Sequence, residues 1–255
     1  MATAPNEVAM PLFYNDLVPL NSDEHAKFHA RSTDKALWLK NSHAIPLTVE
    51  EFPQAQRHYP IVFSSGDSPI PLALMGMNEG VNVFVDDEGQ VTESIYLPAY
   101  VRRYPFLLAK LRPEADELSL CFDPTSDLLG EFEDGLPLFD GAEPSEVCKN
   151  TLKFCEQFEI AGQKTAAFMA ELKKHDLLMD GELNIEINGF DQPFNYRGFQ
   201  MVNEAKLREV RGDVLRSWNQ NGLLPLIFAH LFSLELIRDI FDRQVKAGKG
   251  PIALN

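Results

Sequence analysis

The chain has 255 residues, of which 45% are hydrophobic, and carries a formal net charge of −15. This length and apolar content suffice to bury a sizeable core, so disorder of the whole chain is excluded. The acidic balance argues against binding to nucleic acid phosphates and to anionic lipid surfaces, because both need clustered lysine and arginine.

The N-terminal part predicts a tail, an arm and two short helical segments. Residues 1–10 lack the basic and apolar regions of a secretory signal, which favours a cytoplasmic location. Residues 1–20 as a whole resemble an extended arm, whose apolar side chains should dock against the body. Asn21 can cap a short helix that reaches Ala30, and Thr48 to Gln56 repeats this signal weakly.

A series of short strands follows. Three apolar segments separated by turn residues predict an antiparallel meander, and Thr92 to Tyr96 would extend it. Two more apolar segments further along the chain are each expected to form a strand. The five predicted strands are residues 60–63, 72–77, 81–85, 106–110 and 118–122.

No lysine or arginine lies between Arg112 and Lys149, and acidic residues recur throughout this segment. Apolar residues such as Leu138 and Phe139 are interleaved with the acids, which favours a partly docked surface loop over disorder. The alternative is a calcium loop, but the regular spacing of oxygen ligands in an EF-hand is missing.

A long amphipathic helix is the strongest local prediction. It should run from Pro144, in its first turn, to Lys174, with a possible bend at Gly162. Cys148 and Cys155 are seven residues apart on this helix and are expected to be small buried side chains. With Cys121 they make three cysteines without metal-ligand spacing, so neither a disulfide framework nor a zinc site is predicted.

The C-terminal part predicts a hairpin and three helices. Strands at 183–187 and 194–201 flank a turn at Asn188 to Asp191, and helices should begin near Asn203, near Gly212 and after Gly222, the last reaching Gln244. The apolar run from Leu223 to Leu234 is too short to cross a membrane, which predicts a buried helix and no membrane insertion.

These elements define an α+β fold. We expect an antiparallel meander, a long amphipathic helix, a β-hairpin and C-terminal helices packed on the sheet. One domain should cover residues 10–245, with a β-rich part at 57–125 and a helix-rich part at 144–245, and residues 1–9 and 247–255 should be flexible tails. Phenylalanines at 154, 158, 168, 228 and 232 are assigned to the core.

The most informative motif places two adjacent arginines within an aromatic segment bracketed by proline, residues 96–106. A guanidinium suits a carboxylate or phosphate, so Arg102 is the candidate for recognition and Arg103 for a structural role. In an extended segment Tyr100, Arg102 and Tyr104 would share one face. The alternative is structural, with an arginine paired to an acid while Tyr96, Tyr100 and Tyr104 pack over the aliphatic stems.

Two further residues are weaker ligand-binding candidates. Asn82 ends a predicted strand, where it more often bonds to nearby backbone, and His230 lies in the apolar helix, where a buried and hydrogen-bonded state is the stronger alternative. His25 and His29 could meet on one helical face, but a metal would need a third ligand that the sequence does not supply. We therefore predict no metal site, no cofactor and no catalytic residue.

The segment from Tyr96 to Phe106, together with Asn82 to Asp86 upstream, resembles the core of the SapC family of bacterial proteins. Residues 198–207 and 222–234 are similar to the second half of that family. The resemblance covers roughly residues 10–245. The family name implies an association with bacterial surface layers, but the resemblance implies no activity, cofactor or catalytic residue.

Three hypotheses about function result. The leading one is a non-enzymatic cytoplasmic protein that binds a protein, a peptide or a small anionic ligand through residues 96–106. The second is an enzyme of unassigned class, with His58 or His230 brought near Asp86 by the fold. The third is a structural component of a surface layer. The sequence does not indicate the oligomeric state.

Overall fold

The computed structural model describes residues 10–112, 117–185 and 194–250. They form an α+β fold with antiparallel sheets, which confirms the predicted class. The chain divides into two compact units, and each unit draws on two separate segments. Unit 1 comprises residues 1–34 and 103–157, and unit 2 comprises residues 35–102 and 158–255.

The N-terminal arm docks within unit 1, as its apolar content predicts. Strand β1 (Val18–Pro19) pairs with β7 (Ser119–Phe122), which pairs in turn with β6 (Phe106–Ala109). The hydroxyl of Tyr14 donates a hydrogen bond to the carbonyl of Phe106 at 2.6 Å. Strands β6 and β7 were both expected from the sequence.

The acidic segment of unit 1 is also docked, and its described residues contribute four short strands besides β7. Leu138 is fully buried and Phe139 nearly so, which confirms that this segment is not a solvated tail. The pairs are β8 (Leu129–Gly130) and β9 (Leu136–Pro137) on either side of β2 (His29–Ala30), and β10 (Phe139–Asp140) with β11 (Glu143–Pro144).

Helix α1 (Ser22–His25) is shorter than expected, although Asn21 caps it by accepting a hydrogen bond from the Glu24 N–H. The chain leaves the helix at once to form β2. A core of apolar side chains lies between the strands of unit 1 and the first turns of the long helix. Its buried members are Phe106, Leu108, Phe122, Leu129, Leu138, Phe139 and Cys155.

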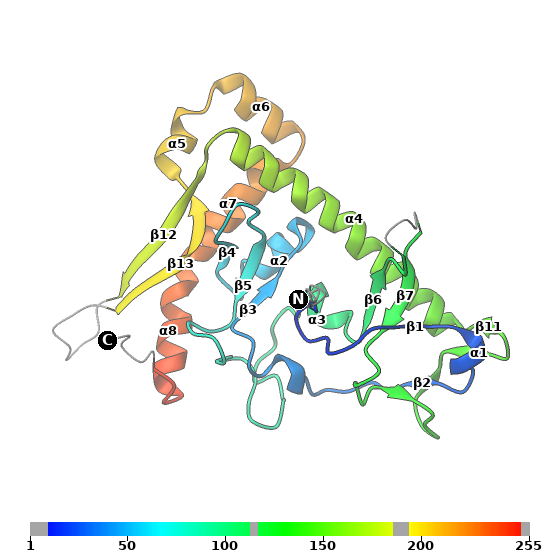
Figure 1. The fold of residues 1–255 in the computed structure, drawn as a ribbon. Helices are drawn as coiled ribbons and strands as arrows, with labels where there is room; N and C mark the ends of the chain where they lie inside the picture. Colours follow the sequence, from blue (N-terminus) through cyan, green and yellow to red (C-terminus); the bar gives the residue numbers. More distant parts are fainter. Residues whose placement is uncertain (1–9, 113–116, 186–193, 251–255) are drawn as a thin grey trace, which may run out of the picture. The chain divides into compact units, whose positions relative to one another are not determined.

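The long helix is α4 (Glu146–Lys174), and it runs without interruption through Gly162 (Figure 1). Its start differs from the prediction, because Pro144 pairs in β11 instead of occupying the first turn. Cys148 and Cys155 are buried free thiols on this helix, as expected.

Unit 2 contains a five-stranded antiparallel sheet in the order β12-β13-β4-β5-β3. The predicted hairpin forms, and β13 joins it to the first half of the chain through the pairing of Phe199 with Ser64. The predicted turn at 188–191 lies outside the described residues. The strands are β3 (Ala44–Pro46), β4 (Ile61–Ser64), β5 (Pro71–Leu74), β12 (Leu178–Ile185) and β13 (Phe194–Val202).

The strand predicted at 81–85 is wrong, and so is its extension at 92–96. An isolated bridge between Val85 and Val91 is the pairing found there. The cause is Asn82, whose side-chain oxygen accepts a hydrogen bond from the Phe84 N–H at 2.8 Å. This local bond curls the backbone and competes with a ladder.

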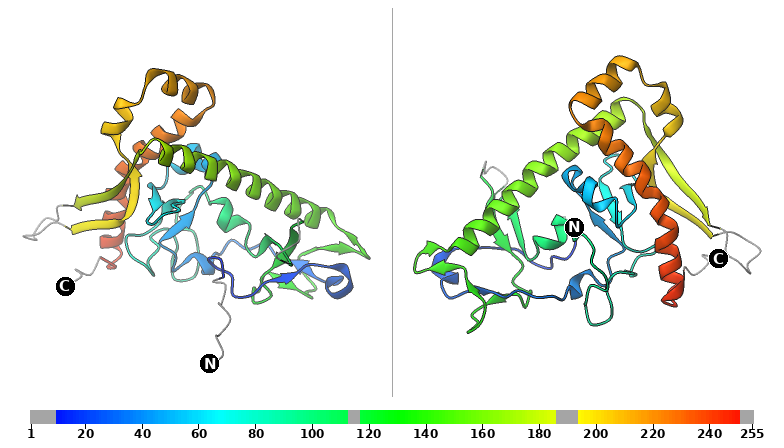
Figure 2. Two further views of the ribbon diagram at one scale, coloured as in Figure 1. Left: turned by 45° about the horizontal axis from the view of Figure 1, so that its top comes forward. Right: turned by 180° about the vertical axis from the view of Figure 1, so that it is seen from behind.

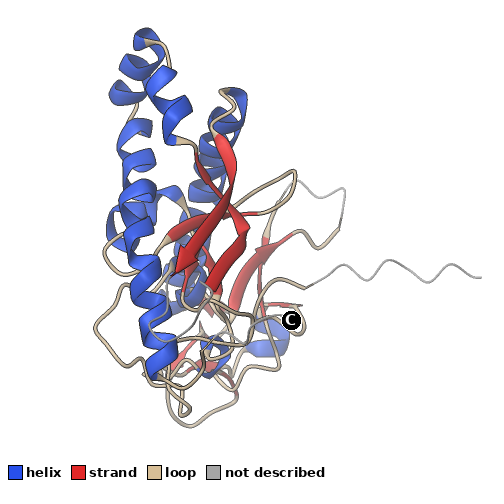
Figure 3. Cartoon of the chain, turned by 90° about the vertical axis from the view of Figure 1, so that its left-hand side faces the viewer, coloured by secondary structure: helices blue, strands red, loops and turns tan. Residues whose placement is uncertain are grey.

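Helices cover one face of this sheet (Figure 3). The ring of Phe63 on β4 contacts both Phe168 of α4 and His230 of α7, so these two helices lie on the same side. Helix α7 is thus packed on the sheet, as predicted for the C-terminal helices. The α-helices of unit 2 besides α4 are α2 (Phe52–Ala55), α3 (Ala99–Arg102), α5 (Glu204–Glu209), α6 (Gly212–Gln220), α7 (Leu223–Ser233) and α8 (Ile237–Lys246).

Three short 3₁₀ turns also occur in the described part of unit 2. The turn η3 (Leu234–Leu236) joins α7 to α8, so the two follow one another along the chain almost directly (Figure 2). The turn η2 (Val49–Glu51) leads into α2 and begins with a capping box between Thr48 and Glu51. A third turn is η1 (Leu37–Leu39).

Helix α7 is buried on one face only, which corrects the prediction of a buried helix. Ile227 and His230 are fully enclosed, whereas Phe228 and Phe232 are 39% and 68% exposed and stack on each other. The assignment of these two phenylalanines to the core is therefore wrong. No helix of the described residues has the length and apolar content needed to cross a membrane.

Candidate ligand-binding site

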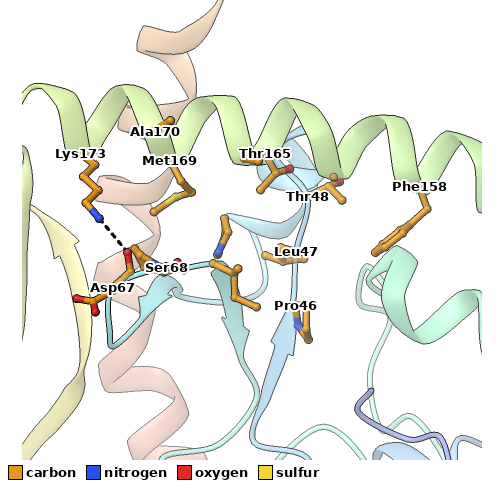
Figure 4. A pocket seen from close by; sticks show the side chains of 15 residues that line it. Pro46, Leu47, Thr48, Asp67, Ser68, Phe158, Thr165, Met169, Ala170 and Lys173 are labelled. Atoms are coloured by element: carbon orange, nitrogen blue, oxygen red, sulfur yellow. Dashed lines mark hydrogen bonds between the residues drawn. The ribbon is translucent and has the colours of Figure 1, made fainter. Parts of the chain in front are cut away.

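A groove of about 470 Å³ lies in unit 2 between helix α4 and the strands β3 and β5 (Figure 4). We call it the α4 groove. Its size falls within the range of roughly 300–1,000 Å³ that is usual for small-molecule sites. It is lined by Pro46, Leu47, Thr48, Asp67, Ser68, Pro69, Ile70, Pro71, Phe158, Gly162, Thr165, Ala166, Met169, Ala170 and Lys173.

The helix side of the α4 groove is built by residues four positions apart, because such residues share one face of a helix. Phe158, Thr165 and Met169 point from α4 toward the strands in Figure 4. At Gly162 a side chain would meet no atom within 4 Å of its first carbon. The space over this glycine is therefore open.

Several polar groups in the walls of the α4 groove are already paired. The Thr165 hydroxyl donates to the Ala161 carbonyl at 2.7 Å and accepts from the Val49 N–H at 3.0 Å. The Leu47 N–H donates to the Pro71 carbonyl at 2.9 Å, which joins the two strand-side walls. The middle of the groove thus offers an apolar surface.

Lys173 marks one end of the α4 groove. Its ammonium group donates to the backbone carbonyl of Asp67 at 3.0 Å (Figure 4). Within the described residues, no carboxylate lies within 4.0 Å of this ammonium, whereas the neighbouring Lys164 and Lys174 pair with Glu50 and Glu171. Lys173 therefore brings a positive charge to a groove whose lining is mostly apolar.

A buried carboxylate links one wall of this groove to the arginine-bearing segment. Glu51 is only 5% exposed. Its Oε2 accepts from the N–H and the hydroxyl of Thr48, at 2.8 and 2.9 Å. Its Oε1 accepts from the Ala99 N–H at 2.6 Å and from the Tyr96 hydroxyl at 3.0 Å. All these donors stabilise a charge that burial would otherwise destabilise.

The segment held by Glu51 is not extended. Ala99 to Arg102 form the helical turn α3, so the prediction that Tyr100, Arg102 and Tyr104 share an extended face is wrong. Pro98 precedes the turn, and its carbonyl accepts hydrogen bonds from the Val101 and Arg102 N–H groups. Tyr100 is buried, and its ring contacts the ring of Phe158 at the edge of the α4 groove.

Arg102 is exposed and ordered by its neighbours. Its Nε donates to the Leu97 carbonyl at 3.0 Å, and one terminal nitrogen donates to the Tyr96 hydroxyl at 3.2 Å. Burial, followed by the charge of Glu51, raises the pKa of Tyr96, so this hydroxyl stays protonated as the donor to Glu51.

Arg103 and Tyr104 belong to unit 1, so the boundary between the units divides the segment after Arg102. Arg103 is 6% exposed, and its guanidinium lies 5.9 Å from the ring centre of Tyr14. Tyr104 packs edge-on against the same Tyr14 ring. These contacts are of the kind expected for a structural arginine, whereas Arg102 faces solvent.

Asn82 and His230 are both buried in unit 2. Asn82 donates to the carbonyls of Leu39 and Ser42 at 3.1 Å, in addition to capping Phe84. The Nε2 of His230 accepts from the Val202 N–H at 3.0 Å, and its Nδ1–H donates to the Ile61 carbonyl at 2.7 Å. Burial lowers the pKa of His230 to about 4. These bonds occupy both ring nitrogens.

The groups required by the enzyme hypothesis do not meet in the described parts of the chain. Asp86 Oδ1 accepts from the N–H groups of Glu88 and Gln90, and no hydrogen bond joins it to His58 or His230 there. Across residues 10–112, 117–185 and 194–250, no group of three His, Cys, Asp or Glu side chains could hold a metal ion.

The suggested pairing of His25 and His29 on one helix is wrong. Helix α1 ends at His25, and His29 lies in strand β2. The His25 Nδ1 is instead within hydrogen-bonding distance of the Asn21 backbone, and its ring packs against Phe28 and Phe122.

The sequence did not single out Glu51 or Lys173. Glu51 lies three residues after Thr48, the spacing of a capping box, and this was the available signal. The local pattern could not show that the same carboxylate also holds residues 96 and 99. Nothing in the sequence distinguishes Lys173 from its neighbour Lys174, because only the fold places one of them at the groove.

The SapC family model matches residues 20–240 of the chain. The chain therefore belongs to the SapC family, as the resemblance of its motifs indicated. Neither a curated protein nor a solved structure gave a significant match.

Proposed function

We propose that this SapC-family protein is a non-enzymatic binding protein, which recognises an anionic group of a protein, a peptide or a small molecule through Arg102. One observation carries the proposal: Arg102 is an exposed guanidinium, oriented by Tyr96 and Leu97, on a turn anchored by the buried Glu51. A planar guanidinium matches the geometry of a carboxylate or phosphate.

The anchoring of the Arg102 side chain supports recognition, because it lowers the entropy cost of ordering that side chain when a ligand binds. A free arginine side chain loses about 2 kcal/mol of rotamer entropy when a ligand immobilises it. The contacts of Arg102 with Tyr96 and Leu97 offset part of this cost before any ligand binds.

The test compares wild type with Arg102→Ala and Arg102→Lys. Each protein is isolated gently from its own host and analysed by native mass spectrometry, with inorganic phosphate and a glutamate-rich hexapeptide as added probes. We expect wild type to retain an added mass or bind a probe, and Arg102→Ala to lose it. Arg216→Ala removes an exposed arginine elsewhere and is the charge-matched control. Equal binding by wild type and Arg102→Ala would refute the assignment of Arg102.

Two other functions compete with this proposal. The first is the enzyme hypothesis. Catalytic turnover by wild type that is lost in His58 or Asp86 variants would favour it over binding. A structural role in a surface layer would be favoured by extracellular recovery and regular self-assembly. The cytoplasmic location that we propose is supported by three buried free thiols, Cys121, Cys148 and Cys155.

A further inference from the structure

The α4 groove is separate from Arg102, and it has its own chemistry. It is an open space beside one helix, with apolar walls and a single lysine among its lining residues. Phe158 and Lys173 are fifteen positions apart on α4, which corresponds to about 22 Å along a helix axis. The groove is therefore long in comparison with its volume of about 470 Å³.

The walls are poorly suited to an extended peptide. A peptide that adds to a sheet needs free backbone N–H and C=O groups along its path. Pro46, Pro69 and Pro71 have no N–H, and the Leu47 N–H is bonded to the Pro71 carbonyl. Ile70 uses its N–H on the Ser64 hydroxyl and its carbonyl on the Ser64 N–H.

An unbranched aliphatic chain needs no such partners. It gains free energy by leaving water, and it can lie along apolar side chains without a hydrogen-bond partner of its own. The open space over Gly162 lets such a chain approach the helix backbone. Leu47 and Met169 line opposite walls of the groove with apolar side chains, and both are largely buried.

Lys173 determines the end group of the ligand. Its ammonium has three N–H donors, and one of them meets the Asp67 carbonyl. Because no carboxylate of the described residues lies within ion-pairing distance of this ammonium, it can pair with an anion at the end of the groove. The Asp67 carboxyl, which also lines this end, disfavours a ligand with several negative charges.

We propose that the α4 groove binds a single free aliphatic carboxylate, with the chain between Phe158 and Ala170 and the carboxylate at Lys173. This inference goes beyond the proposed function, because it concerns different residues and a different class of ligand.

The experiment is an isothermal titration of the full-length protein with decanoate, kept below its micellar concentration. Decan-1-ol and acetate test the chain and the carboxylate separately. We expect one decanoate to bind per chain, decan-1-ol to bind more weakly and acetate not to bind. Lys173→Met should weaken decanoate binding about three- to tenfold and leave decan-1-ol unchanged. Lys174→Met, which removes the same charge from the adjacent residue, should bind decanoate like wild type.

A second variant tests the location without depending on charge. Gly162→Leu places a side chain in the open space of the groove, and leucine favours the helical backbone of α4, so the fold should be retained. We expect this variant to lose both decanoate and decan-1-ol, with an unchanged or higher melting temperature.

The proposal is overturned if wild type does not bind decanoate, or if Gly162→Leu binds it as wild type does. Equal losses of decanoate affinity in Lys173→Met and Lys174→Met would overturn the placement of the carboxylate at Lys173. Association with phosphatidylcholine vesicles in the absence of decanoate binding would also overturn it, in favour of a lipid surface.

Discussion

The backbone N–H of Ala99 lies 2.6 Å from the carboxylate Oε1 of Glu51, a residue 48 positions earlier in the chain. The same carboxylate completes a capping box with Thr48. One buried side chain therefore begins two helical turns that are distant in sequence, η2 and α3.

Replacing Glu51 by Gln should destabilise the protein by about 2–4 kcal/mol, because an amide nitrogen cannot accept the hydrogen bonds that one carboxylate oxygen now accepts. Urea unfolding followed by circular dichroism measures this change. Glu50→Gln is the matched control, since Glu50 is exposed and pairs with Lys164 at the surface, and its loss should stay below about 1 kcal/mol. Equal losses in the two variants would show that Glu51 does not anchor the segment.

The two adjacent arginines should differ in their effect on stability. Arg103→Ala removes a buried side chain packed on Tyr14 and should cost about 2 kcal/mol, while Arg102→Ala should cost less than about 1 kcal/mol. Thermal unfolding of both variants at one protein concentration gives the comparison. A larger loss of stability in Arg102→Ala than in Arg103→Ala would show that Arg102 is the structural arginine of the pair.

His230 should make stability depend on pH in a defined window. Its pKa is about 4 in the fold and 6.5 ordinarily, so between these values the unfolded chain binds a proton that the folded chain does not. Its contribution is therefore present above pH 6.5 and is lost as the pH falls toward 4, by up to about 3 kcal/mol.

The measurement compares wild type with His230→Gln, whose side chain does not titrate. The free energy of unfolding of wild type, relative to this variant, should fall by about 2 kcal/mol between pH 7 and pH 5. A difference that does not change with pH would mean that His230 has an ordinary pKa in the fold.

Two glycines should respond in opposite ways to the same substitution. Gly162→Ala should stabilise the protein by about 0.5–1 kcal/mol, because alanine favours a helix and its methyl group meets open space. Gly181→Ala should destabilise it by about 1–3 kcal/mol, since its methyl carbon would lie 2.1 Å from the ring of Phe199. Urea unfolding of both variants tests the pair, and a loss of stability at Gly162 would show that the groove is closed in solution.

Local signals predicted the parts of the fold that local bonds determine. Asn21, Thr48 and Asn203 each cap a helix or turn within three residues, and all three were visible as sequence patterns. Helix α4 was predicted because apolar residues recur at helical spacing over many turns. The segment at 81–85 was misassigned, because the Asn82 side chain that bonds locally to the Phe84 N–H also donates to the carbonyls of Leu39 and Ser42, which lie about forty residues away.

The candidate site was harder to predict. The aromatic segment drew attention to Arg102 because of its composition alone, and its helical turn depends on Glu51. The α4 groove combines residues 46–48, 67–71 and 158–173, which meet only after the sheet has formed. Charge, periodicity and spacing describe each of these segments but not their convergence.

The pairing of β4 with β13 has a consequence for synthesis on the ribosome. Ser64 leaves the ribosome long before its partner Phe199 exists, while the hairpin of β4 and β5 can form at once. Until β13 is made, one edge of β4 exposes unpaired backbone groups and apolar side chains, which is the condition under which nascent chains aggregate. The first half of this protein is therefore expected to need the protection of a chaperone during translation.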